Sequence, residues 1–524
     1  MCTAPVSSYQ QVKDESWFAS GPAIVWHIAA SVLLLHFLTA NRYGYFGDEM
    51  YFMACGEHLD WGYVDQPPLI ALVAWLTRHL FGTSLFAVRL IPALAGFVLV
   101  WLTGLVTREL GGRPFAQGLA ALCTACAGVY LILYHLLTMN AFEPLLWMAC
   151  AYVVIRIIKT GNQKLWLWFG VLAGLGLENK YSMAVFGFAI VVGLVLTKER
   201  KALASKWIWV AGLVAFLIFL PNLIWNIQHH WPFLELMRNI RASGRDLPFT
   251  PLGYIRAQIF LMTPVTFPVW LLGGLYFFFW QEGKPFRLLG WAFISVLVVF
   301  IVLHGKDYYA APVYPMVFAG GAIAIERFSA GKRTGWLKPV VVALSLVNLL
   351  AFFPLVFPVL SPENFLRYQA RVPFKIQPDE KGMVAEPMPH HYSWCFGWEE
   401  MVRGVAKAYD SVRAQDRADT AIFANDFGAA GAIDLLGPKY GLPKAISGHQ
   451  NYWLWGPRHY TGQTMIIVGD TPEEARRWFN EVTVIVELHN PYADPSENKP
   501  VLLCRGPKQF HSLAEAWPKL KNWD

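Results

Sequence analysis

Three carboxylic acids lie close together directly after an apolar segment long enough to cross a bilayer. Asp48 and Glu49 fall in residues 47–51 (GDEMY), and Asp65 falls in residues 61–69 (WGYVDQPPL). Carboxylates this close to hydrocarbon are costly unless they face water or a protein cavity. A partly desolvated carboxylate is also a better base than one in bulk water. We therefore expect base chemistry at a membrane surface, with the rest of the chain positioning this stretch.

The composition is typical of a polytopic α-helical membrane protein. The 524 residues are 55% hydrophobic and only 15% charged, with a mean hydropathy of +0.37, whereas soluble proteins carry about 25% charged residues. The formal charge of +7 comes largely from Lys and Arg in short loops between apolar segments. That placement is a topology signal, so nucleic acid is not expected as a partner.

Apolar stretches of bilayer-spanning length recur through the first 360 positions. We expect about eleven transmembrane helices, at 21–40, 90–107, 115–134, 141–158, 165–178, 181–197, 207–227, 255–280, 287–303, 309–327 and 336–358. The polar residues 1–20 and the length of the first apolar segment favour an uncleaved helix over a signal peptide. Residues 67–81 are too short to span and amphipathic, which predicts an interfacial helix in the first external loop.

Lys and Arg are much denser in one set of alternate loops than in the other. The dense loops are 107–114, 156–164, 198–206, 280–287 and 327–338. By the positive-inside rule these loops are cytoplasmic. The sequence thus predicts a multi-pass protein of the cytoplasmic (inner) membrane with a cytoplasmic N-terminus, while the Asp48 loop and everything after position 358 lie outside.

From position 361 the composition becomes more charged, and no further membrane-length run appears. Residues 420–424, 465–469 and 482–487 read as strands, and 472–480 as a helix capped by Thr471. We therefore expect two domains: a transmembrane domain over 1–360 and a small extracytoplasmic α/β domain over 361–524.

Cysteine and histidine give little sign of a metal centre. Cys123 and Cys126 form a C-x-x-C within an apolar run that has no second ligand pair, which disfavours zinc. Whether Cys395 and Cys504 pair is left open. The histidines, including His58 and the pair His390-His391, read as hydrogen-bonded residues rather than ligands. No cofactor is required, although the clustered acids are compatible with a divalent metal.

Polar side chains from several predicted spans gather on the outer side of the membrane. Besides the acids of the first loop, they include Arg89, Asn140, Glu143, Glu178, Lys180, Lys306, Asp307, Tyr308 and Tyr309. Asn140 and Glu143 share a helix face by their spacing. Carboxylates and cations on one side suit a reaction in which a base deprotonates an acceptor while cations hold an anionic leaving group.

These motifs resemble the glycosyltransferase family 39/83-like proteins of the GT-C superfamily, which includes protein O-mannosyltransferases and lipid A aminoarabinose transferases. The resemblance rests on 47–51 and 61–69, and on the later motifs at 179–181 (NKY), 306–309 (KDYY), Pro312 and 314–315 (YP). It covers about residues 20–330, and the part after 361 looks like the tails of bacterial members.

The resemblance implies transfer of a sugar from a polyprenyl-phosphate donor to a lipid, glycan or protein acceptor on the outer face, with inversion. By position, Asp48 matches the general base and Glu49 its partner, while Lys180 and Lys306 match basic positions near the lipid phosphate. The family often has an Asp at the start of the fourth span, where this chain has Asn140 and Glu143. Arg89, Tyr308, Tyr309 and Asp65 complete the predicted substrate-binding set.

Plainer roles compete for several of these residues. Glu49 could instead be structural and pair with a nearby Arg, and Arg89 could serve only to hold the first loop in place. Lys180 and Lys306 could be interface anchors. At the level of function, two rivals are a polar-lipid transporter or flippase and a non-catalytic sugar-binding sensor. A transporter predicts charges near the bilayer midplane and paired broken helices in two related halves.

Overall fold

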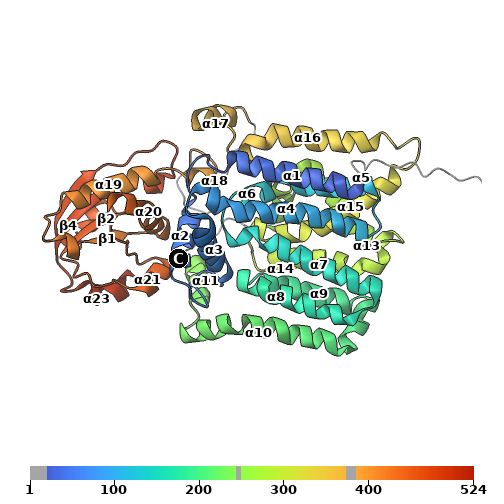
Figure 1. The fold of residues 1–524 in the computed structure, drawn as a ribbon, viewed down its shortest axis with the longest axis horizontal. Helices are drawn as coiled ribbons and strands as arrows, with labels where there is room; N and C mark the ends of the chain where they lie inside the picture. The colour runs from blue at the N-terminus through green and yellow to red at the C-terminus, as the bar shows by residue number, and fades with distance from the viewer. Residues whose placement is uncertain (1–19, 244–248, 373–384, 524) are drawn as a thin grey trace, which may run out of the picture.

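The protein is a bundle of roughly parallel helices with a small sheet-containing part at one end (Figure 1). The computed structural model describes residues 20–243, 249–372 and 385–523, so the predicted polar segment before Ser20 falls outside it. Within those ranges, seven helical segments are long and apolar enough to cross a membrane: Gly21–Thr39, Leu85–Glu109, Met139–Thr160, Lys206–Gln228, Lys284–Val302, Asp307–Phe328 and Leu337–Val356. The chain is therefore a multi-pass membrane protein.

The α-helices of these segments are α1 (Gly21–Thr39), α4 (Leu85–Glu109), α7 (Glu143–Thr160), α10 (Lys206–Gln228), α14 (Arg287–Val302), α15 (Tyr314–Phe328) and α16 (Leu337–Val356). The central helix α15 is almost wholly buried, whereas α10 and α16 lie at opposite sides of the bundle and expose most of their apolar surface. Exposed apolar surface of that extent is stable only against lipid.

Shorter helices stand at the four remaining predicted spans. They are α5 (Pro114–Cys126), α6 (Gly128–Leu133), α8 (Trp166–Asn179), α9 (Met183–Val195), α12 (Pro251–Leu261) and α13 (Phe267–Phe279). The predicted span at 255–280 is not one continuous helix: its two helical pieces are bent by 101°, as in a broken span or a re-entrant loop. At the bend Thr263 adopts φ of 64° and is followed by Pro264, which has no N–H to continue a helix. The number of spans stays a prediction.

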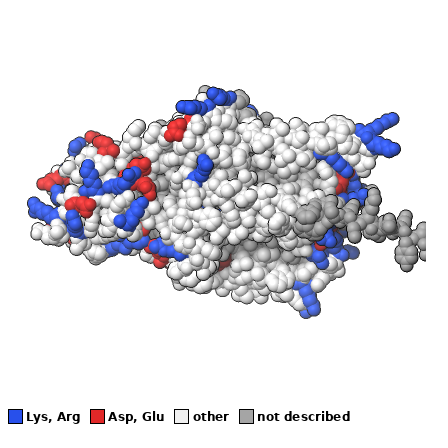
Figure 2. Space-filling view, turned by 45° about the horizontal axis from the view of Figure 1, so that its top comes forward, with Lys and Arg blue, Asp and Glu red and all other residues white. Residues whose placement is uncertain are grey.

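The apolar band of the molecule separates two charged ends (Figure 2). Lys and Arg predominate at the end away from the sheet, while both signs of charge mix around the sheet. That asymmetry agrees with the positive-inside pattern of the loops.

At the sheet-side end of the bundle lie α2 (Gly47–Glu57), α3 (Leu69–Phe81), α11 (Pro232–Ala242), α17 (Pro362–Gln369) and α18 (His390–Ser393). Helix α3 matches the expected interfacial helix. Helix α2 was not predicted, since its residues read as a loop. It begins where the carboxylate of Glu49 accepts a hydrogen bond from the backbone N–H of Phe46, at 2.9 Å, which caps the first turn.

The C-terminal part contains a mixed four-stranded sheet in the order β1-β2-β4-β3. Its strands are β1 (Ala421–Ala424), β2 (Thr464–Val468), β3 (Phe479–Val486) and β4 (Val501–Pro507). Strands β1 and β2 are parallel, whereas β4 runs antiparallel to both β2 and β3. The helices are α19 (Trp398–Asp410), α20 (Phe427–Leu436), α21 (Gln450–Trp455), α22 (Pro472–Ala475) and α23 (Leu513–Ala516).

One sequence expectation for this part needs correction. The helix expected over 472–480 is only the single turn of α22, although Thr471 and Glu474 form its capping box. The chain then enters β3 at Phe479, because pairing with β4 outweighs the local helical pattern. The six described cysteines, Cys395 and Cys504 among them, are all free.

The sheet-containing part packs directly on the first loop through α20 and α2. One continuous apolar core includes Met50 and Tyr51 of α2 together with Ala430 and Ile433 of α20. A Cβ atom added at Gly431 would lie 2.9 Å from the backbone of both Met50 and Tyr51. The two helices therefore touch with no room for a side chain between them.

Replacing Gly431 by alanine is expected to lower stability by about 1–3 kcal/mol, because overpacking forces the two helices apart. The matched control is Gly187→Ala in α9, where an added Cβ meets no atom within 4 Å. Removing a helical glycine there should raise stability by about 0.5–1 kcal/mol. Thermal unfolding of both variants in detergent tests the contact, and equal stabilisation of the two would contradict it.

Candidate active site

A buried ion pair fixes the position of the first external loop. Arg89 on α4 donates to both carboxylate oxygens of Glu49, from Nε at 3.2 Å and from the guanidinium NH2 at 3.1 Å. The side chain of Glu49 is fully buried and that of Arg89 is 3% exposed. The backbone N–H groups of Phe46 and Leu137 donate to the same carboxylate, at 2.9 and 3.1 Å. Glu49 is thus saturated by four donors.

Most of the other hydrogen bonds of Arg89 reach the chain between α1 and α2, and one more joins its guanidinium to Nε2 of His135 at 3.3 Å. Its guanidinium donates to the carbonyl oxygens of Ala40, Arg42 and Gly44 at 2.9, 3.2 and 2.6 Å. Because the charges of Glu49 and Arg89 are paired and hydrogen-bonded inside the protein, this geometry does not support the predicted catalytic role of Glu49 or substrate binding by Arg89. We reassign both residues to positioning, the plainer of the two roles that the sequence left open.

The adjacent residue on α2 faces a different environment. Asp48 is half-buried. Burial and the neighbouring Asp65 carboxylate raise its pKa to about 7, against the opposing effects of His390 and Lys306. Burial likewise raises the pKa of Asp65 to about 6, although a 2.8 Å hydrogen bond donated by the Tyr51 hydroxyl opposes the rise. We call Asp48 and Asp65 the acidic pair.

A second group of predicted site residues is centred on Lys180, at the end of α8. Its Nζ donates to Oδ1 of Asn140 at 2.7 Å and lies 3.4 Å from Oε2 of Glu143. The same ammonium lies 4.3 and 5.4 Å from the ring centres of Tyr309 and Tyr308. The structure therefore brings five predicted site residues together, and we call them the Lys180 cluster.

Two cations act electrostatically on Asp48. Lys306, immediately before the turn that carries Tyr308 and Tyr309, is exposed, and its charge lowers the pKa of Asp48. His390 of α18 acts in the same direction. The Lys306 position predicted from sequence thus belongs to the electrostatic surroundings of Asp48.

The C-terminal part contributes contacts to the first loop that the sequence did not reveal. Asn451 accepts a hydrogen bond from the backbone N–H of Val64 at 2.7 Å, and the Phe427 ring packs against that of Tyr51 in a tilted arrangement, with ring centres 4.7 Å apart. His58 stacks on Trp455 at 4.3 Å. These partners are separated by almost 400 positions, so no local pattern could join them. The local signal that could have placed Tyr51 at the site was its i, i+3 spacing from Asp48, which puts both residues on one helical turn.

Comparison with known proteins supports the fold. The family profile described as dolichyl-phosphate-mannose-protein mannosyltransferase matches residues 65–225. The structure superposes on that of ArnT from Cupriavidus metallidurans bound to undecaprenyl phosphate with a TM-score of 0.61, at 13% identity, covering 92% of this chain and 99% of that one. The chain has the fold of the GT-C glycosyltransferases. A second GT-C structure, the oligosaccharyltransferase AglB from Archaeoglobus fulgidus in complex with an inhibitory peptide and a dolichol-phosphate, aligns at a TM-score of 0.51 and 12% identity, covering 96% and 78% of the two chains.

Two curated relatives match this chain at 24% identity. One is the undecaprenyl phosphate-α-4-amino-4-deoxy-L-arabinose arabinosyl transferase 1 of Pseudomonas fluorescens (strain Pf0-1), over 51% of this chain and 49% of the relative. The other is the lipid A galacturonosyltransferase RgtD of Rhizobium johnstonii, over 45% and 50%. The chain thus spans about half the length of the curated relatives it matches.

The closed network around Arg89 predicts a large structural cost for its removal. Arg89→Ala leaves Glu49 buried without its partner, which should destabilise the protein by about 3–5 kcal/mol. Arg403→Ala on α19 is the control, since its side chain is 57% exposed and its loss should change stability by less than about 0.5 kcal/mol. Thermal unfolding and the yield of monodisperse protein are the measurements. A stable Arg89→Ala protein would refute the positioning role.

Proposed function

We propose that the protein transfers a sugar from a polyprenyl-phosphate-linked donor to an acceptor on the outer face of the cytoplasmic membrane, with inversion at the anomeric carbon. The observation that carries the proposal is the acidic pair beside cationic groups at one end of a GT-C bundle. The acceptor is a lipid, glycan or protein. The relative from Pseudomonas fluorescens and the ArnT structure, whose names include undecaprenyl phosphate, support this class of donor. The relative named for lipid A supports a lipid acceptor.

Asp48 is the proposed general base. A base works best when its pKa lies near the working pH, because it is then available as the ionised form and still accepts a proton readily. A pKa of about 7 meets that condition. Asp65 contributes through its negative charge, which helps to raise the pKa of Asp48. Its own carboxylate is oriented by the Tyr51 hydroxyl.

Lys180 and Lys306 are the proposed binders of the lipid phosphate. Departure of the sugar leaves negative charge on that phosphate, and ammonium groups fixed at a low-dielectric interface stabilise the charge without rearranging water. Lys180 is held by Asn140 and Glu143 and backed by two tyrosine rings, so its ammonium is already oriented. Glu143 stands where the family often has an Asp, and here it sets the position of Lys180.

The position of the site lets a lipid-linked donor reach it from the membrane. The prenyl chain of such a donor lies among membrane lipids, and the apolar band of the molecule ends at α2 and α3. Helix α3 is amphipathic and lies directly after the acidic pair along the chain. A site at this level can reach the headgroup phosphate while the prenyl chain stays in the bilayer.

The rival transporter reading receives less support. It expects paired broken helices in two related halves. The described residues contain one bent pair, α12 with α13, and the charged groups of the site lie on α2, at the start of α7 and just after α8. The sensor reading expects independent parts, whereas α20 and α2 share a core.

Replacing Asp48 by asparagine is expected to lower the rate of sugar transfer by about 10²- to 10⁴-fold, because the base is lost while the shape is kept. The assay uses membranes or purified protein with radiolabelled polyprenyl-phosphate sugars and measures transfer to lipid, glycan and protein fractions. Glu399→Gln, an exposed acid of α19, is the control. Unchanged transfer by a well-folded Asp48→Asn protein would refute Asp48 as the base.

The acidic pair predicts a specific pH dependence. Activity needs ionised Asp48, so kcat/KM should rise with pH up to about 7, the pKa of this group. Asp65→Asn removes the like charge and lowers that pKa, while the amide oxygen can still accept from Tyr51. The rising limb should therefore move to lower pH in the variant. A limb that stays in place would mean that Asp65 does not set the ionisation of Asp48.

A further inference from the structure

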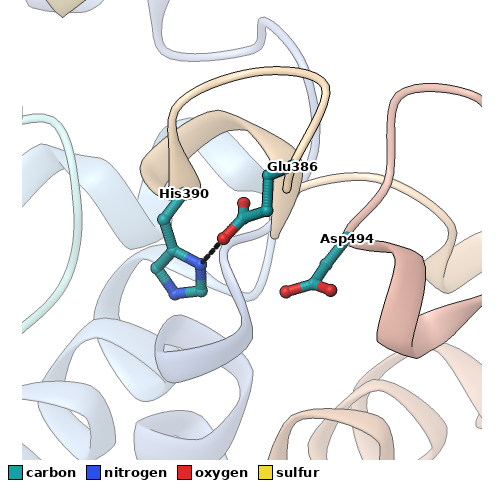
Figure 3. Close-up of side chains that lie close together, drawn as sticks. All are labelled: Glu386, His390 and Asp494. Carbon is teal, nitrogen blue, oxygen red and sulfur yellow. Dashed lines mark hydrogen bonds and ion pairs between the residues drawn. The ribbon is translucent and has the colours of Figure 1, made fainter. Parts of the chain in front are cut away.

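Three side chains outside the proposed catalytic groups converge where α18 meets the loop between β3 and β4. Glu386, His390 and Asp494 each present one potential ligand atom, and these atoms all lie within 4.8 Å of one another. The carboxylate of Glu386 lies between the imidazole and the second carboxylate in the close-up view (Figure 3). Nδ1 of His390 is 3.0 Å from Oε1 of Glu386.

A second observation separates this group from an ordinary hydrogen-bonded pair. The side chain of Glu386 is 7% exposed, and its other oxygen, Oε2, is buried with no hydrogen-bond partner in the described structure. Buried polar atoms are nearly always paired, and an unpaired carboxylate oxygen is costly. The hydrogen bond to His390 explains one oxygen of Glu386 and leaves the other unexplained.

The second carboxylate of the group is held in a fixed position. Asp494 is itself oriented by two hydrogen bonds to Oδ1, donated by the backbone N–H and the hydroxyl of Ser496 at 2.8 and 2.7 Å. Outer hydrogen bonds of this kind hold metal-binding carboxylates in place.

We propose that Glu386, His390 and Asp494 bind a divalent transition metal of the Zn²⁺ or Mn²⁺ class, with water completing the coordination. Ligand atoms bound at about 2.0–2.2 Å are separated by about 3–4 Å, which agrees with the observed grouping after small side-chain adjustments. One imidazole with two carboxylates suits these metals better than Mg²⁺ or Ca²⁺, which favour oxygen ligands alone.

The site would join two parts of the chain that flank the acidic pair. His390 begins α18, and its ring lies 5.8 Å from that of Phe46, just before α2. Asp494 belongs to the loop between β3 and β4. A metal held by both connects the sheet to the segment that covers α2, and its double charge acts on Asp48 in the same direction as His390 does. The inference stands independently of the proposed sugar transfer.

The test measures metal content and stability, and it needs no substrate. Full-length protein with its affinity tag removed is stripped with a chelator, incubated with Zn²⁺ or Mn²⁺, and desalted. We expect about one metal ion per chain by mass spectrometry and a melting temperature that rises with metal concentration, because binding to the folded state stabilises it. Glu386→Gln and Asp494→Asn should lose both effects.

Two controls keep the result interpretable. Asp48→Asn should bind metal like the unaltered protein, whereas loss of binding in this variant alone would place the metal at the acidic pair and overturn the proposal. Wild-type protein that binds no metal would overturn it as well. If the Glu386 and Asp494 variants do not fold, X-ray absorption at the zinc edge of the unaltered protein decides. One imidazole among oxygen ligands supports the site, and any other ligand set refutes it.

Discussion

The ion pair of Arg89 with Glu49 is the interaction on which the rest of the site depends. Breaking this buried ion pair would be strongly destabilising, because the remaining charge would be buried without a partner. Here the carboxylate has four donors, and the guanidinium reaches three carbonyl groups between α1 and α2. Because α1, α2 and α4 meet at this one point, the first turn of α2 has a single arrangement. The position of Asp48, the residue before Glu49, is therefore fixed as well.

The proposed base and the proposed phosphate-binding cation have different partners at the site. Burial and the charge of Asp65 raise the pKa of Asp48. The ammonium of Lys180 instead lies against the Glu143 carboxylate and two tyrosine rings. If Asp48 and Lys180 formed an ion pair with each other, neither a free base nor a phosphate-binding cation would remain. Under the proposed function, this separation lets deprotonation of the acceptor and stabilisation of the departing phosphate proceed on different groups of one surface.

Sequence reasoning found the residues that local patterns can reveal. Hydropathy located the membrane helices, and the motifs around Asp48, Lys180 and Tyr308 identified residues that the structure brings together in two groups. It failed where distant pairing decides the outcome. The β3–β4 pairing overrode a helical pattern after Pro472, and Thr263 with Pro264 broke an apolar run that looked continuous. The roles of Glu49 and Arg89 also needed the fold, since their partners are backbone groups.

The contact at Gly431 limits how the two parts of such a chain can be exchanged. A chimaera joined near position 360 would set a foreign α20 against the native α2, where the helix backbones touch without an intervening side chain. Small differences in helix shape between donor and recipient would then displace the turn that carries Asp48. Successful grafts would have to carry α2 and α20 together, even though most of the bundle lies between them in the sequence.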